Sequence, residues 1–217
     1  MTNLLNNIVR ATGFTLGQEV DIWYALHKSL QVLAAKLDDD AGVGNGAGTY
    51  EALCFTALIN ASITNSQGNL VFNRKGDENF YTIAPTGITN EARHWLMYNY
   101  TNAWETLCEQ LDADAAVGNG SGTYEALCFT AKFLHIVVDP KGQTDLGNGT
   151  VFYFTPGCSD RKMFVEWLYN AIDALETLTE QLDADGTVTD TDYEELTYET
   201  YCLVNVENAA GSTVGNG

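Results

Sequence analysis

The sequence predicts an α+β fold, in which a helical bundle of repeated long-helix and short-helix units carries inserted antiparallel β-hairpins. Three observations predict it: one segment occurs three times, apolar residues with helical spacing precede each copy, and strand-like stretches follow the first two copies. The 217 residues, of which 45% are hydrophobic, suffice for a sizeable core. We therefore expect one domain, residues 1–217, made of internal repeats.

The recurring segment begins with Leu-Asp and continues into a Tyr-Glu pair. Residues 37–57 and 111–131 are nearly identical and begin 74 residues apart. A third, more diverged copy spans residues 182–196, begins 71 residues after the second, and has a loop two residues shorter. Self-similarity at a nearly fixed period is typical of repeat architectures. The copies define three predicted units: about 14–87, about 88–158 and a truncated third unit at about 159–217.

A long amphipathic helix is predicted before each copy. Apolar residues stand 4, 7 and 14 positions before the opening Leu, which places them on one face of an α-helix. A tyrosine stands 13 positions before it in every copy: Tyr24, Tyr98 and Tyr169. Side chains that favour the N-cap position precede the helices: Thr15, Thr89 and Ser159-Asp160. The Asp-rich segments should end each helix, because Asp is a poor interior residue.

A short helix and a hairpin should complete each unit. Tyr50 and its equivalents open the short helix, and residues 69–73 with 78–83 read as two strands around a polar turn. Residues 134–138 and 150–154 form the second predicted pair. The third unit ends where its hairpin should begin, which would leave strand edges unpaired and favour self-association. The predicted assembly interface consists of Phe72, Phe80, Tyr81, Phe152, Tyr153 and Phe154.

The charge of the chain excludes some partners. Twenty-nine Asp and Glu residues face ten Lys and Arg, for a formal net charge of −19. Such a surface repels nucleic acid and anionic lipid, so we expect neither as a partner. No apolar run reaches the ~18 residues of a membrane span, and the first residues do not read as a secretory signal. Five cysteines at irregular spacing favour reduced thiols over a disulfide framework.

The Asp-rich loops are weak calcium candidates. In the third copy, Asp183, Asp185 and Glu194 occupy positions 1, 3 and 12 of an EF-hand-like loop. Val188 replaces the glycine that such a loop needs at position 6, which argues against an ordered site. The other interpretation is a helix stop followed by a solvated acidic turn.

Catalytic motifs are not evident. The three histidines lack zinc spacing, and Cys108, at a helix position that is small in all copies, is better explained as a core residue. Repetition argues against catalysis, because an active site needs one asymmetric set of groups. We expect no enzyme, no catalytic residue and no cofactor. An enzyme would need a pocket where the repeat is broken, near Cys158 and His135.

Residues 182–193, Leu-Asp-Ala-Asp-Gly-Thr-Val-Thr-Asp-Thr-Asp-Tyr, resemble a motif of small structural proteins from the virions of tailed bacteriophages. An amphipathic helix precedes the motif there too. Residues 37–50 and 111–124 are diverged versions, so the resemblance covers the helix-and-loop parts, under half of the chain. It implies a virion component and no catalytic residues.

The leading prediction is thus a non-enzymatic virion protein that decorates or cements the capsid or forms a head fibre, with neck or tail as other placements. It would bind itself and other virion proteins. The alternative is a calcium-dependent adhesion or carbohydrate-binding module that uses the Asp loops and exposed aromatic residues.

Overall fold

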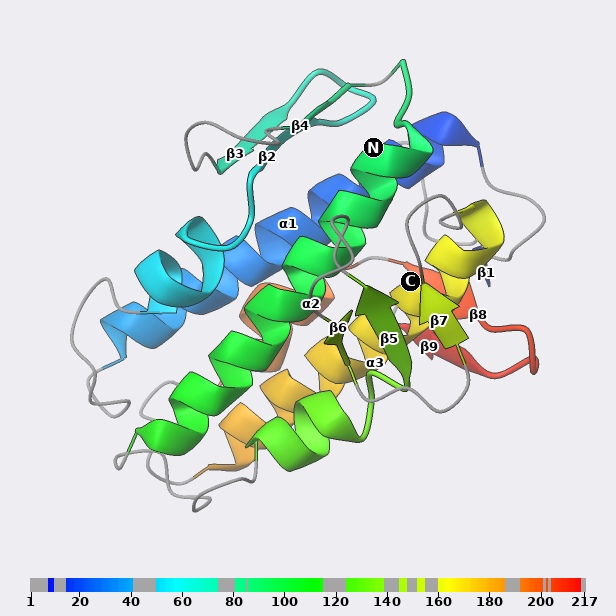
Figure 1. The fold of residues 1–217 in the computed structure, drawn as a ribbon. Coiled ribbons are helices and arrows are strands. Elements are labelled where there is room, and N and C mark those ends of the chain that lie inside the picture. Colours follow the sequence, from blue (N-terminus) through cyan, green and yellow to red (C-terminus); the bar gives the residue numbers. More distant parts are fainter. Residues whose placement is uncertain are drawn as a thin grey trace.

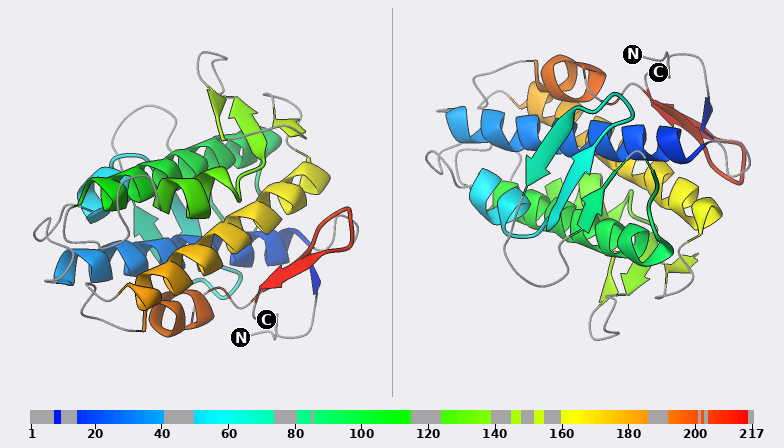
Figure 2. Two further views of the ribbon diagram at one scale, coloured as in Figure 1. Left: turned by 90° about the horizontal axis from the view of Figure 1, so that it is seen from below. Right: turned by 90° about the horizontal axis from the view of Figure 1, so that it is seen from above.

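A computed structural model describes most of the chain as a mixture of helices and small sheets, an α+β arrangement (Figure 1). Three long helices run in the same direction, and their C-terminal ends gather at one end of the molecule (Figures 1 and 2). The helices are α1 (Leu16–Asp39), α2 (Asn90–Ala113) and α3 (Arg161–Ala184). The described residues are 8–9, 15–40, 50–73, 81–84, 86–114, 124–138, 145–147, 152–154, 160–185, 192–200, 202 and 204–215.

The long helices begin where the sequence predicts. The side chains of Thr15, Thr89 and Asp160 each accept a hydrogen bond from a backbone N–H in the first turn, and Thr15 forms a capping box with Gln18. Such caps satisfy N–H groups that have no partner inside the helix. An extended aspartate ends each helix: Asp40, Asp114 and Asp185. The predicted caps and Asp stops are confirmed.

The predicted short helices are present as π-helices. Their wider turn is seen in the bond from the N–H of Ala57 to the carbonyl of Ala52, and in the equivalent bond from Ala131 to Ala126. This winding buries Cys-Phe pairs side by side against the long helices. The elements are η1 (Glu51–Thr56), η2 (Glu125–Thr130) and η3 (Glu194–Glu199).

The first sheet differs from the predicted hairpin. Its strands are β2 (Ala61–Thr64), β3 (Leu70–Asn73) and β4 (Tyr81–Ile83). The central strand β2 pairs antiparallel with β3 and parallel with β4, so β3 and β4 do not form the predicted hairpin with each other; residues 78–80 of that prediction lie outside the described residues. Strand β2 was not predicted, because its short Ala-Ser-Ile-Thr run lacks the aromatic residues of its neighbours, although three of its four residues are buried.

The second sheet repeats this arrangement. Its strands are β5 (His135–Val138), β6 (Asp145–Leu146) and β7 (Phe152–Phe154). The strand β5 pairs antiparallel with β6 and parallel with β7. The predicted antiparallel pairing of residues 134–138 with 150–154 is therefore wrong. Strand β6, which lies between β5 and β7 in the sequence, pairs with one edge of β5, and β7 pairs with the other edge.

The third sheet contains a hairpin near the end of the given sequence, where the sequence analysis predicted that one would be missing. The strands β8 (Asn205–Glu207) and β9 (Thr213–Gly215) form a hairpin, and β1 (Ile8–Val9) pairs parallel with β8. The third strand comes from the other end of the chain, so no periodicity near residue 217 could indicate it. Both edges of β8 are paired within the chain, so the expected missing hairpin and its unpaired edges do not occur here, and self-association stays a prediction.

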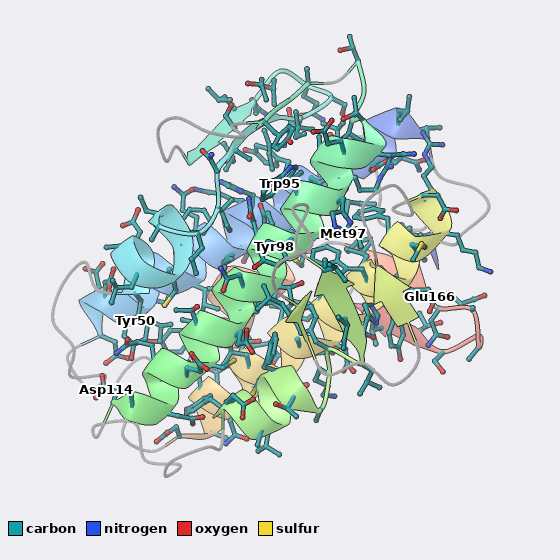
Figure 3. The ribbon with its side chains drawn as sticks, viewed as in Figure 1. Tyr50, Trp95, Met97, Tyr98, Asp114 and Glu166 are labelled. Atoms are coloured by element: carbon teal, nitrogen blue, oxygen red, sulfur yellow. The ribbon has the colours of Figure 1, made fainter. Side chains whose placement is uncertain are left out.

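Two of the hairpin turns are built alike. The side chain of Asn65 accepts hydrogen bonds from the N–H groups of Gln67 and Asn69, and Asn208 does the same for Ala210 and Ser212. A carboxylate from the neighbouring long helix holds each turn. Asp21 accepts from Ser66, and Glu166, labelled in Figure 3, accepts from the N–H of Ala209. The first and third sheets are thus tied directly to the long helices that precede them, α1 and α3.

A single core lies between the three long helices. Trp23 is fully buried, and its ring centroid lies 5.4 Å from that of Tyr100 and 5.2 Å from that of Trp167. Each of the three residues comes from a different helix, so the aromatic cluster joins all three. Met97 is fully buried in the same core.

Two glycines give contrasting stability predictions. Gly147 has φ of 102°, and a Cβ there would lie 1.9 Å from the carbonyl oxygen of His135. We expect Gly147→Ala to lower the free energy of unfolding by about 2 kcal/mol or more. Gly17, in the first turn of α1, has no neighbour nearer than 3.9 Å, so Gly17→Ala should raise it by about 0.5 kcal/mol. Urea denaturation of both variants measures the difference, and equal effects would contradict this assignment.

Candidate functional site

The most strictly repeated described residues meet at the end of the molecule where the long helices finish. In each copy, the aspartate directly after the opening leucine binds the start of the following π-helix. The carboxylate of Asp38 accepts hydrogen bonds from the N–H groups of Tyr50 at 2.6 Å and Glu51 at 3.0 Å. Asp112 and Asp183 make the equivalent pairs of bonds, at 2.6–3.0 Å, to Tyr124 and Glu125 and to Tyr193 and Glu194. A negative charge at a helix N-terminus is stabilising.

The aspartate three positions after the opening leucine of each copy binds a tyrosine from a different copy. The Tyr50 hydroxyl donates to Asp114 at 3.3 Å (both labelled in Figure 3). The Tyr124 hydroxyl donates to Asp185 at 3.1 Å, and the Tyr193 hydroxyl donates to Asp40 at 2.9 Å. The first copy thus binds the second, the second binds the third, and the third returns to the first. We call these six residues the tyrosine–aspartate cycle.

The cycle is buried. The three tyrosines are at most 1% exposed, and the three aspartates are 6–7% exposed. Hydrogen bonds to a carboxylate in such surroundings are stronger than those between neutral groups. The cycle therefore joins the C-terminal ends of α1, α2 and α3 through the first residues of the short helices.

Loss of one hydroxyl from the cycle should have a measurable cost. We expect Tyr50→Phe, Tyr124→Phe and Tyr193→Phe each to lower the free energy of unfolding by about 1–3 kcal/mol, because a buried carboxylate loses a donor. Tyr24→Phe, at a half-buried tyrosine outside the cycle, should change it by less than about 0.5 kcal/mol. Denaturant titrations that give all four variants the same stability would show that the cycle is unimportant.

The calcium candidates take part in these contacts. The carboxylate of Asp183 accepts from two backbone N–H groups, and that of Asp185 accepts from the Tyr124 hydroxyl. Glu194 is half-buried in η3, and Val188 lies outside the described residues. Within the described ranges, no group of three or more His, Cys, Asp or Glu side chains is placed to hold a metal ion.

This arrangement predicts a weak and unselective response to calcium. Asp183 and Asp185 would have to give up hydrogen bonds within the protein before they could bind the ion. We expect 5 mM calcium and 5 mM magnesium to change the melting temperature by the same small amount, through screening of the net charge of −19. Differential scanning fluorimetry in both salts checks this. A large rise with calcium alone would support the adhesion-module alternative instead.

The histidines are engaged within the core. His27 shares a hydrogen bond with the Tyr100 hydroxyl, and burial, with a smaller effect from Lys28, lowers its pKa to about 3. The Nε2–H of His94 donates to the carbonyl of Val138 at 2.7 Å. The side-chain amide of Asn170 donates to Nδ1 of His135 at 2.8 Å, and burial lowers the pKa of His135 to about 4. His27 and His135 are therefore neutral at physiological pH.

The described cysteines are buried thiols. Cys54, Cys108, Cys128 and Cys202 are at most 1% exposed and free of disulfides. Burial raises the pKa of Cys54, Cys128 and Cys202 to about 12 and that of Cys108 well above its usual range. Cys108 is a core residue, as predicted. Cys158, which was considered with His135 for a catalytic pocket, lies outside the described residues.

The predicted assembly residues are only partly described. Phe80 lies outside the described residues, as do the side chains of Phe72, Phe152, Tyr153 and Phe154. Tyr81 is half-buried and lies against Trp95 of α2, with ring centroids 6.5 Å apart. Burial, and then the nearby Glu91, raises the pKa of Tyr81. Trp95 in turn makes an edge contact with Tyr98, and Figure 3 labels both.

The tyrosine–aspartate cycle was not predicted from the sequence. Its residues were visible as repeated letters, because each copy has an aspartate three positions after its opening leucine and a tyrosine before its Glu. Their partners were not visible, because each bond joins residues of two different copies that are 61, 64 or 153 positions apart in the chain.

No described helix is both long enough and apolar enough to cross a membrane. Comparison with known proteins gives no match to this chain among protein-family models, curated proteins or solved structures.

Proposed function

We propose that this chain is a non-enzymatic structural protein of a tailed-bacteriophage virion that acts through contacts with other virion proteins. Decoration or cementing of the capsid is the placement that we favour, with a head fibre as the other. The observation that carries the proposal is the tyrosine–aspartate cycle. The motif that resembles virion proteins uses its aspartates and tyrosine to hold the protein together.

The proposal includes a finer description of the fold. The chain is one domain of three units, each with a long helix, a π-helix and a three-stranded sheet, arranged around the helix bundle with approximate three-fold symmetry. Three sets of packing contacts support this: η1 packs on α1 and α2, η2 on α2 and α3, and η3 on α3 and α1. Corresponding strand pairings in the three sheets support it as well.

The chemistry of the described residues supports a structural role. The aspartates of the motif accept hydrogen bonds inside the protein, His27 and His135 are held neutral, and the described thiols are protonated. Catalysis requires groups that can exchange protons or attack a substrate in an accessible site. A net charge of −19 also suits a protein that remains outside the DNA compartment of a virion.

Particles produced in cells that express the gene test the proposal. We expect the protein to co-purify with virions through a density gradient, and antibodies against it to label the particle shell in electron micrographs. A virion preparation from a strain that lacks the gene is the control. Absence of the protein from purified virions would overturn the proposal, and label confined to the tail would overturn the placement on the capsid.

Self-association of the purified protein remains a separate prediction. Light scattering at several protein concentrations checks it, and the aromatic strand residues would then be buried between chains. A monomer at all concentrations would contradict this part of the prediction and would leave binding to other virion proteins as the mode of assembly.

A further inference from the structure

We propose that the strand β1 is an exchangeable clasp, which completes the β8–β9 hairpin of its own chain in the single molecule and that of a second copy in an assembly. The partner that fits this surface is therefore a second copy of the same chain. The inference rests on the assembly role in the proposed function and names the surface through which two copies bind each other.

The first observation is that β1 occupies the same place in the repeat as β4 and β7. Seven positions separate the last residue of each strand from the first residue of the long helix that follows: Val9 from Leu16, Ile83 from Asn90, and Phe154 from Arg161. Each strand pairs parallel with the first strand of a hairpin that follows a π-helix. Each unit therefore donates one strand to the sheet of another unit.

The second observation is that the strand donated by β1 closes a ring of units. The strands β4 and β7 complete sheets whose other two strands come shortly before them in the sequence, so the chain itself holds those joints together. The joint made by β1 differs, because Val9 pairs with Val206, 197 positions later in the sequence. Noncovalent contacts alone make this joint, and the same contacts form within one chain or between two.

The third observation is that β1 is the smallest of the three donated strands. It forms two residue pairs with β8, whereas β4 and β7 each form three with their partners. Its release leaves α1 bound to η3, because the Ser29 hydroxyl donates to the carbonyl of Thr197 and the Tyr193 hydroxyl donates to Asp40. The strand therefore opens without disruption of the helix bundle, as a local opening of low cost.

The fourth observation is the match between β1 and the edge that it covers. Val9 is 3% exposed and Val206 is fully buried, so release of β1 uncovers apolar surface together with one backbone edge of β8. An uncovered strand edge binds an added strand. A second copy carries the identical strand, and its Val9 restores the packing on Val206. Because the contacts broken within one molecule are the same as those formed between two, the concentration of neighbouring copies decides which form is populated.

A particle surface supplies that concentration. The net charge of −19 opposes association of free copies, so the closed form should dominate in dilute solution. Copies that are bound side by side on a shell are held at an effective concentration of about a millimolar or more. The seven positions from Val9 to Leu16 span at most about 25 Å, so exchange joins only adjacent copies.

Disulfide trapping between two copies tests this inference. Val9→Cys and Val206→Cys are prepared as separate single variants, mixed at about 1 mM in about 0.5 M salt, and oxidised with glutathione disulfide. Paired strands lie about 4.8 Å apart, which suits a disulfide between paired positions. We expect a covalent dimer linked between the two substituted positions, which peptide mass spectrometry identifies. Dilution by about a hundredfold should lower its yield at least about tenfold.

The matched control is a mixture of Ile63→Cys and Ile83→Cys. These positions are also paired parallel and buried, but they belong to β2 and β4, which the chain itself holds together. We expect no linked dimer from this mixture beyond the yield of each single variant alone. Val9→Cys and Val206→Cys combined in one chain should instead close internally in dilute solution, and light scattering should then show a monomer at all concentrations. Melting temperatures under reducing conditions establish that every variant is folded.

The outcomes separate the clasp from the proposed function. Mixed Val9→Cys and Val206→Cys chains that give no linked dimer, or no more than the control mixture, would overturn the exchange. A folded double variant that does not close internally would overturn the clasp itself. Association of the oxidised double variant to the same extent as the wild type would show that copies bind through another surface. None of these results touches the virion function, which fails only if the protein is absent from purified virions.

Discussion

Replacing Arg93 by methionine should lower the free energy of unfolding by about 3–5 kcal/mol. The Arg93 guanidinium donates to both carboxylate oxygens of Glu19, at 2.5 and 3.1 Å, and also to the side-chain oxygen of Asn90 at 2.6 Å. Glu19 is fully buried and Arg93 is 2% exposed. The substitution leaves a carboxylate in the core without its main partner, which costs far more than the pair itself contributes.

Two further variants isolate this cause. Glu19→Leu combined with Arg93→Met removes both charges, and we expect it to recover most of the stability lost in Arg93→Met. Arg161 lies 3.5 Å from the same carboxylate, but 38% of its side chain is exposed, so Arg161→Met should cost less than about 1 kcal/mol. Urea unfolding followed by far-ultraviolet circular dichroism measures all three. Similar losses in Arg93→Met and Arg161→Met would show that burial is not the deciding factor.

Replacing Trp23 by alanine should also cost about 3–5 kcal/mol. Trp23 is fully buried, and its indole contacts Tyr100 of α2 and both Phe164 and Trp167 of α3, with ring centroids 5.0–5.4 Å apart. Removal of the indole leaves a cavity where all three helices meet. The side chains around this cavity belong to packed helices that cannot move together to fill it. Relaxation of the structure should therefore recover little of the lost stability.

Trp95 provides the matched control for this prediction. It is half-buried on α2 and contacts Tyr81 and Tyr98 at ring-centroid distances of 6.5 and 6.4 Å. We expect Trp95→Ala to cost about 1 kcal/mol, because a half-exposed side chain leaves no closed cavity. Thermal and denaturant unfolding compare the two. A loss in Trp95→Ala as large as that in Trp23→Ala would contradict the assignment of Trp23 to the centre of the core.

The two large effects lie where the copies of the repeat differ. Glu19, Arg93 and Phe164 each stand 18 positions before the opening leucine of their copy. The first two form the buried ion pair, and the third packs on Trp23 with ring centroids 5.0 Å apart. The interior of the bundle is therefore less symmetric than the tyrosine–aspartate cycle at its end.

Sequence patterns predicted the helices well, because helix formation depends on residues close together in the chain. The caps at Thr15 and Thr89 and the aspartate stops each act over three or four residues. The same patterns placed strand residues correctly at 70–73, 81–83, 135–138 and 152–154. The pairing of those strands was wrong, because a parallel neighbour leaves no local signal comparable to a hairpin turn.

The candidate site shows the same limit. The sequence identified Asp183 and Asp185 as notable residues and left open whether they bind calcium or end a helix. It could not show that Asp183 holds the start of η3 or that Asp185 accepts a hydrogen bond from Tyr124.

The sequence by itself determined that one motif occurs three times, that an amphipathic helix precedes each copy, and that α-helices and strands alternate along the chain. Only the tertiary structure decided which elements meet: β1 with β8, Tyr193 with Asp40, and the three long helices around Trp23. The physical reason is distance along the chain. Hydrophobic periodicity and caps are local properties, whereas these contacts join residues up to about two hundred positions apart and form only when the whole core assembles.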